Sequence, residues 1–286
     1  MAHLLKGAPV VEAMNEAIGR EAAMLKECGV IPALAIVRVG EREDDISYER
    51  GATKRCEKAG VEVRSIALAA DTSQDDLIRV IEELNRDEKV HGVLLFRPLP
   101  KHIDDDAVRN VLAPEKDVDG ITDLSLAGVF ANTDTGYSPC TPQACMEIFE
   151  HYGIDLKGKK AVVIGRSLVV GKPAAMMLLA RNATVTVCHT RTADMPAICR
   201  EAEVLIVSAG RAGILDKSYL APGQIVIDVG IHVKEDGSLC GDVKFEDADA
   251  IAEAVTPVPG GVGTVTTSVL VKHVVEAAKK RVEAAK

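Results

Sequence analysis

The stretch AVVIGRSLVVGKPAAMMLLA, residues 161–180, decides the fold class of this chain. It begins as an apolar run typical of a buried strand, leaves that run at Gly165, and becomes helical where Gly171 and Pro173 stand close together. Proline suits the first turn of a helix, because the N–H that it lacks would have no partner within the helix there. A strand, a glycine turn and a helix start in this order point backbone N–H groups at one place, as dinucleotide-binding folds do.

The glycine spacing of this loop leaves two interpretations open. Gly165 and Gly171 are separated by five residues, so the usual G-x-G-x-x-G pattern is absent. On spacing alone, a plain connection between a strand and a helix fits as well as a nucleotide loop.

The charges near the loop favour a nucleotide, and NADP rather than NAD. A NAD site usually has an acid at the end of the second strand, where it binds the ribose 2′-hydroxyl. Here that strand ends in CHTRT (188–192), which contains no acid. Basic and hydroxyl groups that suit a 2′-phosphate stand there and in the first turn, namely Arg166, Ser167, Thr190 and Arg191. The alternative is that Arg166 and Arg191 are only solvated surface charges.

Helical and extended patterns alternate on both sides of this stretch, in two blocks. The patterns predict strands at 33–40, 61–68, 90–96, 159–165, 183–189, 203–210 and 223–230. They predict helices at 9–28, around 47–56, 72–85, 142–153, from 171 on, at 193–202 and at 266–283. Strands that alternate with helices predict right-handed crossovers and parallel sheets. We therefore expect an α/β protein of two domains with a cleft between them.

Composition excludes several classes of protein. The net charge of −9 argues against a nucleic-acid partner or an anionic membrane surface, both of which need a basic footprint. Seven cysteines without a C-x-x-C motif indicate neither a disulfide framework nor a zinc site, so we expect no metal. No apolar leader or run of about 18 apolar residues is present, and we expect a cytoplasmic protein.

Three further stretches look specialised. PEKDVDGIT (114–122) places two acids before a glycine, although most Asp-Gly pairs are turns. YSPCTPQA (137–144) is a stiff entry to a helix, and TPVPGGVGTVT (256–266) suits a backbone that closely approaches a flat ligand.

Together with GVLLFRPLP, VIGRSLVVGKP, CHTRT, VIDVGI and GDV, these stretches resemble the bacterial bifunctional methylenetetrahydrofolate dehydrogenase/methenyltetrahydrofolate cyclohydrolase family, in its order and near its spacing. The resemblance covers nearly the whole chain. It implies a folate-binding catalytic domain at 1–139, completed by a C-terminal helix at 266–286, and a Rossmann-like NADP domain at 140–265. It also implies a tetrahydrofolate substrate, NADP as cofactor and a homodimer.

The resemblance assigns roles to individual residues. Tyr48 would pack on the folate and Asp119 would bind its pterin, and we take this pair as the catalytic candidates. The substrate would also contact Phe96, Pro259, Gly260 and Gly261. The dinucleotide would contact Gly165, Arg166, Ser167, Thr190 and Ile231, with Arg191 close by.

Two departures from the family pattern concern the hydrolytic step. The family usually has a lysine four residues after the tyrosine and a glutamine before Leu-Pro-Leu-Pro, whereas this chain has Ala52 and Phe96. Lys54 is about 240° round the helix from Tyr48, and the guanidinium of Arg55 cannot act as a base. We therefore expect a dehydrogenase with weak or absent cyclohydrolase activity, and a separate cyclohydrolase in the pathway.

Two alternatives stay open at this point. One is a fully bifunctional enzyme in which Lys54 or a water network acts in hydrolysis. The other is a non-catalytic paralogue that only binds folate or nucleotide, against which the intact KDVDG and TPVPGGVG motifs argue.

Overall fold

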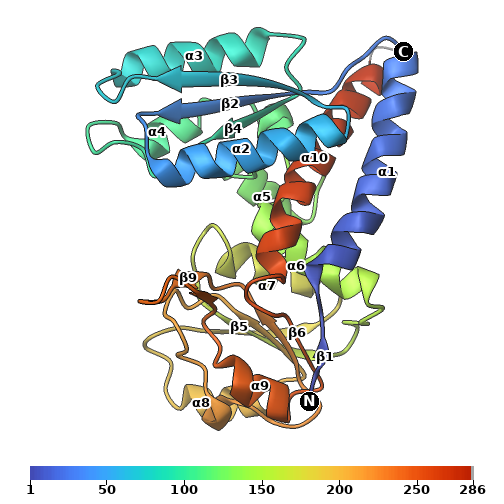
Figure 1. Ribbon diagram of the computed structural model, residues 1–286, viewed down its shortest axis with the longest axis vertical. Coiled ribbons are helices and arrows are strands. Elements are labelled where there is room, and N and C mark those ends of the chain that lie inside the picture. The colour runs from blue at the N-terminus through green and yellow to red at the C-terminus, as the bar shows by residue number, and fades with distance from the viewer. Residues whose placement is uncertain (285–286) are drawn as a thin grey trace. The chain divides into compact units, whose positions relative to one another are not determined.

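The computed structural model describes residues 1–284, which form two compact units (Figure 1). Met1–Glu12 and Thr141–Thr266 make up the six-stranded unit, and Ala13–Cys140 with the chain from Thr267 on make up the three-stranded unit. The sequence-based expectation grouped residues 1–12 with the second of these. They belong to the first because a short strand, β1 (His3–Leu4), pairs with its sheet.

The six-stranded unit is built on one parallel sheet. Its order is β1, β11 (Ala254–Val255), β8 (Ile225–Asp228), β7 (Val204–Val207), β5 (Lys160–Ile164) and β6 (Thr184–Cys188), and every neighbouring pair is parallel. Its helices are α6 (Cys140–His151), α7 (Gly171–Ala180), α8 (Met195–Arg200) and α9 (Phe245–Ile251), with a 3₁₀ turn, η2 (Lys217–Tyr219). A small antiparallel hairpin joins β9 (His232–Val233) to β10 (Leu239–Cys240).

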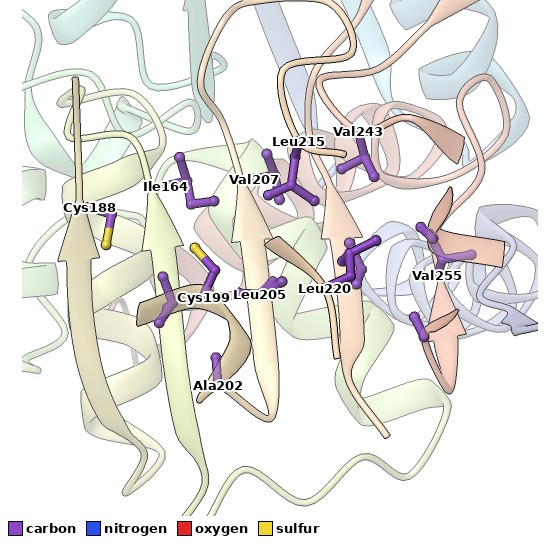
Figure 2. Packing of buried hydrophobic residues seen from close by; sticks show 14 residues of the cluster. Ile164, Cys188, Cys199, Ala202, Leu205, Val207, Leu215, Leu220, Val243 and Val255 are labelled. Carbon is purple, nitrogen blue, oxygen red and sulfur yellow. The ribbon is translucent and has the colours of Figure 1, made fainter. Parts of the chain in front are cut away.

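Continuous apolar strands form the core of this unit, as expected for a parallel sheet covered on both faces. Figure 2 shows Leu205 and Val207 of β7 beside Ile164 of β5, with Cys188 and Cys199 in the same cluster. The carboxyl ends of β5 and β7 thus stand on a packed base, which fixes the loops that follow them.

The three-stranded unit has a parallel sheet in the order β3 (Glu62–Leu68), β2 (Ala33–Val39), β4 (Gly92–Leu95). Its helices are α1 (Gly7–Glu27), α2 (Glu43–Lys58), α3 (Gln74–Arg86), α4 (Asp105–Arg109), α5 (Asp123–Ala131) and α10 (Val262–Ala284), with a 3₁₀ turn, η1 (Pro114–Lys116). The division between the units falls inside α1 and inside α10.

Local sequence explains how the elements of this unit start and pack. Ser73 caps α3, because its hydroxyl accepts the N–H of Asp76. The apolar face of α3 packs with alternate residues of β2 and β4 in one buried cluster that includes Leu77, Ile81 and Val37.

The α/β class and the parallel sheets expected from the sequence are confirmed. Within residues 1–284, no helix is long and apolar enough to cross a membrane.

Candidate active site

Tyr48 lies in the first half of α2, in the three-stranded unit. Its side chain is 40% exposed, while its hydroxyl end lies inside, hydrogen-bonded to Thr267. The ring meets that of Phe96 edge to face, with the centroids 5.7 Å apart. Burial of the hydroxyl raises the pKa of Tyr48, and the nearby carboxylate of Asp119 raises it further. The phenol therefore stays protonated and can donate a hydrogen bond.

Asp119 is held beside Tyr48 by a tight turn. The neighbouring carboxylate of Asp117 is fully buried and accepts the N–H groups of Ile121 and Thr122, at 2.9 and 2.8 Å. Gly120 has φ +66°, and a Cβ there would lie 2.5 Å from the nitrogen of Pro139. The KDVDG turn thus needs glycine at its end, because the SPCTP segment approaches it closely.

The pKa of Asp119 is raised to about 6, chiefly by burial. Asp117 raises this pKa further, whereas a hydrogen bond from the Cys140 thiol and the charge of Arg97 lower it. Arg97 is itself paired with Asp105, whose carboxylate accepts from its Nε at 2.7 Å. Asp119 can therefore change its protonation state close to neutral pH.

Cys140 belongs to the SPCTP motif, and the sequence alone indicates no role for it. The structure buries it with its thiol 3.4 Å from the carbonyl oxygen of Val118, and burial raises its pKa well above the usual value. It stays a neutral thiol that donates to Asp119. The surroundings of Cys140 arise from contacts with a segment about 22 residues earlier in the chain, so no local sequence pattern could have shown them.

The face of α2 beyond Tyr48 carries no lysine. Ala52 is 1% exposed and fills the next position on that face. Lys54 is exposed, and Arg55 donates to the hydroxyl of Ser268 at 3.1 Å. The polar groups described at this place are thus Tyr48, Asp119 and their neighbours.

The loop between β5 and α7 in the six-stranded unit is a tight glycine turn. A Cβ at Gly165, which has φ +124°, would lie 2.4 Å from the carbonyl oxygen of Ser208, and one at Gly171 would lie 2.2 Å from that of Gly165. The hydroxyl of Ser167 accepts the N–H of Val170 at 3.1 Å. No acid stands in the first turn of α7. The backbone is therefore compact enough for a phosphate to approach the helix start.

The sheet order places this loop where doubly wound folds bind ligands. β6 lies on one side of β5 and β7 on the other, so the chain reverses direction across the sheet between β5 and β7. Arg166, Thr190 and Arg191 are all exposed at these strand ends. Among residues 1–284, neither Arg166 nor Arg191 forms an ion pair, which leaves both charges available to a phosphate. The residues present thus fit a dinucleotide.

The remaining candidates also lie in the six-stranded unit. Ile231 follows β8 and is 57% exposed. Gly260, next to Pro259, has φ +103°, and a Cβ at Gly261 would lie 2.5 Å from the carbonyl oxygen of Pro257. The structure therefore brings Tyr48, Phe96 and Asp119 together in one unit and describes the other candidates in the other unit. Within residues 1–284, no group of three or more His, Cys, Asp or Glu side chains could hold a metal.

A parallel sheet with a phosphate loop at its reversal point defines a class, the NAD(P)-binding α/β enzymes. Two family models match the chain: the tetrahydrofolate dehydrogenase/cyclohydrolase catalytic domain over residues 5–119, and the NAD(P)-binding domain of the same family over residues 139–282. The chain belongs to the tetrahydrofolate dehydrogenase/cyclohydrolase family.

Individual relatives are similar to this chain along nearly its whole length. The bifunctional protein FolD of Clostridioides difficile is 49% identical over 96% of both chains. The crystal structure of the bifunctional FolD enzyme from Campylobacter jejuni superimposes with a TM-score of 0.96 at 37% identity, covering 98% of this chain and 100% of the other. FolD of Trypanosoma brucei, crystallised with NADP and an inhibitor, has a TM-score of 0.92 at 34% identity, with 98% of each chain covered.

These relatives overturn one prediction. The expectation of weak or absent cyclohydrolase activity was wrong, because relatives this similar are named bifunctional. They support the alternative interpretation, a dehydrogenase that is also a cyclohydrolase. The prediction rested on Ala52 and Phe96, which stand where the family usually has a lysine and a glutamine, with Lys54 and Arg55 unsuited to act as the base. Asp119, which the sequence marked as a catalytic and pterin-binding candidate, has a pKa of about 6 because of its burial.

Proposed function

We propose that this protein oxidises 5,10-methylenetetrahydrofolate with NADP and hydrolyses the methenyl product. The observation that carries the proposal is the carboxyl of Asp119, with its pKa of about 6, beside the protonated hydroxyl of Tyr48. A group that titrates near neutral pH is suited to acid–base work, and a neighbouring phenol is suited to orient a polar substrate.

In the oxidation, positioning accounts for most of what the chain does. NADP supplies the chemistry by accepting a hydride from the one-carbon bridge of the folate. The two nitrogens of the substrate stabilise the cation that remains, so this step needs no protein base. The chain holds the two reactants in register, which is worth several orders of magnitude in rate.

The preference for NADP rests on the exposed cations at the ends of β5 and β6. Arg166 and Arg191, with the hydroxyls of Ser167 and Thr190, would bind the 2′-phosphate, and Gly165 and Ile231 would contact the dinucleotide. The presence of NADP in the Trypanosoma brucei relative supports this choice.

Folate binding would use the aromatic pair in the three-stranded unit. The exposed part of the Tyr48 ring would stack on the flat substrate, and Phe96 would hold that ring by its edge. Asp119 would accept hydrogen bonds from the pterin. Pro259, Gly260 and Gly261 would lie along the substrate, where their compact backbone permits close approach.

In the hydrolysis, Asp119 would move the proton. Its ionised form takes a proton from water as the water oxygen bonds to the methenyl carbon. The same carboxyl then gives that proton to the ring nitrogen as the carbon–nitrogen bond breaks. The added hydroxyl becomes the formyl C=O and releases its remaining proton to solvent, and the ring opens. Tyr48 donates a hydrogen bond throughout, because its raised pKa keeps it protonated. This route uses no lysine, which fits the presence of Ala52 on this face of α2.

A homodimer, implied by the family resemblance, remains a prediction that sedimentation of the full chain would test.

The proposal is tested by following two chromophores in one reaction. Purified protein receives methylenetetrahydrofolate and NADP, and the absorbances of NADPH and of the methenyl compound are recorded separately. We expect NADPH to form while the methenyl compound stays low. NADPH that forms with equal accumulation of methenyl compound would contradict the hydrolytic half. Absence of NADPH would contradict the whole proposal and favour a binding protein.

A further inference from the structure

The loop that follows β7, residues 208–213, lines the point where the sheet of the six-stranded unit reverses. It leaves the strand next to β5, and its first residue lies against the glycine turn, since a Cβ at Gly165 would meet Ser208. The hydroxyl of Ser208 donates to the carbonyl oxygen of Ile164 at 3.0 Å. This loop is therefore one wall of the site in which the dinucleotide is expected.

One buried carboxylate holds the backbone of this loop. Asp242 is 0% exposed, and its Oδ2 accepts the N–H groups of Ala209 and Gly210, at 2.6 and 3.0 Å. Its Oδ1 accepts the N–H of Arg211 at 2.9 Å. Three consecutive N–H groups thus converge on one buried carboxylate.

The same carboxylate also holds the segment that follows β8. Its Oδ1 lies 2.7 Å from Nε2 of His232. A Cβ at Gly230 would lie 2.5 Å from its Cγ, so the backbone passes directly against it. Ile231, the proposed dinucleotide contact, stands between these two residues. Asp242 therefore joins the loop after β7 to the segment after β8.

Asp242 is fixed in turn by the last residue of β8. The carboxylate of Asp228 accepts the N–H groups of Asp242 and Val243, at 3.0 and 2.9 Å. A Cβ at Gly241 would lie 1.8 Å from an oxygen of Asp228, so only glycine fits between the two acids. The sheet itself thus determines where the Asp242 carboxylate lies.

We propose that Asp242 is a positioning residue for the cofactor: it sets the distance between the two loops that would contact the dinucleotide. It would touch neither reactant and would act through backbone N–H groups and His232. The inference rests on the proposed NADP function. It adds to it a residue that is not among those proposed to contact the dinucleotide.

The Asp242→Asn substitution tests the proposal, because it changes one acceptor oxygen into a donor. The amide can satisfy either the Ala209 and Gly210 pair or the Arg211 and His232 pair, but not both. We expect the dissociation constant for NADPH, measured by fluorescence titration without folate, to rise about 10- to 100-fold. Amide hydrogen exchange at 209–211 should become at least about 10-fold faster.

A matched control is Asp155→Asn. Asp155 also accepts a backbone N–H, from Lys157 at 3.0 Å. It precedes β5 and so lies toward the amino end of that strand, whereas the dinucleotide is expected at the carboxyl ends. Its NADPH affinity should equal that of the wild type. Melting temperatures show whether each variant is folded. His232→Ala, which removes one of the four contacts, should raise the dissociation constant by about 3- to 10-fold and serves if Asp242→Asn does not fold.

The outcomes separate this inference from the function on which it rests. Wild-type protein that does not bind NADPH would overturn both. Wild-type binding together with unchanged affinity in folded Asp242→Asn would overturn the positioning role alone. Unchanged affinity in His232→Ala would do the same if the first variant is unfolded.

Discussion

The rings of Tyr48 and Phe96 meet edge to face, with centroids 5.7 Å apart and planes at 85°. Phe96 stands where a glutamine is usual in the family, so an aromatic contact takes the place of a polar one. In this geometry the positive edge of one ring meets the negative face of the other. The orientation of Tyr48, on which folate binding would depend, is therefore partly set by Phe96.

We predict that Phe96→Ala weakens folate binding. The lost aromatic contact is worth about 0.5–1.5 kcal/mol, so KM for methylenetetrahydrofolate should rise about 2- to 12-fold while KM for NADP stays the same. Steady-state kinetics measures both values. Phe130→Ala is the control, because Phe130 lies in the same unit and is 77% exposed. A KM for folate unchanged in the first variant would remove Phe96 from the site.

We predict that Arg166→Ala impairs the use of NADP far more than the use of NAD. A hydrogen bond between charged groups is worth about 1.5–3 kcal/mol, so KM for NADP should rise roughly 10- to 150-fold. Arg200→Ala is a suitable control, since Arg200 ends α8 in the same unit and donates to the carbonyl oxygen of Ser218. Equal losses with the two cofactors would show that Arg166 does not read the 2′ position.

His91 predicts a pH dependence of stability. It is 6% exposed, and its Nδ1 accepts the N–H of Ala33 at 3.2 Å, so the neutral ring fits the fold. Burial, with the charges of Arg281 and Lys116, lowers its pKa from 6.5 to about 4, while Asp87 opposes this shift. The unfolded chain therefore protonates this ring more readily than the folded one between these values, and the stability contributed by the neutral His91 ring is lost as the pH drops from 6.5 to about 4.

The loss should reach at most about 3 kcal/mol in the free energy of unfolding. Urea unfolding of wild type and His91→Asn at several pH values measures it. The variant should lose less stability than the wild type over this range. His102→Asn, which changes an exposed ring in the same unit, should follow the wild type. If His91→Asn also follows the wild type, another group causes the loss.

Long elements of this fold could be predicted from sequence, and short ones could not. β2 and β5 consist mostly of apolar residues, and both were predicted within one residue at each end. β1 and β11 have two residues each, too few for any periodicity, and their pairing joins positions about 250 residues apart. The assignment of the first residues to the six-stranded unit depends on that pairing, so the sequence pattern missed it.

For the candidate site too, sequence motifs predict some features, and others depend on contacts between distant segments. Tyr48, Asp119 and the glycine loop stand in recognisable motifs. The contact of Cys140 with Asp119 and the four bonds of Asp242 arise only when distant segments meet. The pKa of Asp119 is likewise a property of its burial, which no motif encodes. The expectation of weak or absent cyclohydrolase activity, which the bifunctional relatives contradict, rested on positions 52 and 96.

The last prediction concerns Asp119→Asn. An amide cannot accept the proton from water, so enzymatic hydrolysis of the methenyl compound should fall about 10²- to 10⁴-fold. The wild-type rate, corrected for the rate in buffer, should rise with pH through about 6, as Asp119 ionises. NADPH affinity should not change, because Asp119 lies in the other unit. Asp134→Asn, an exposed acid of the same unit, is the control.

Stability gives an independent check on the same carboxyl. Its pKa is about 6 in the folded chain and 3.8 as the ordinary value, so the folded state binds this proton more tightly. The stabilisation is complete below about pH 3.8. It is lost as the pH rises through 6, because the folded chain must then hold the ionised carboxylate in a buried place. Asp119→Asn should therefore melt at a higher temperature than wild type at pH 7, with the difference shrinking toward pH 4. A variant that is folded and still hydrolyses the methenyl compound at the wild-type rate would exclude Asp119 as the base.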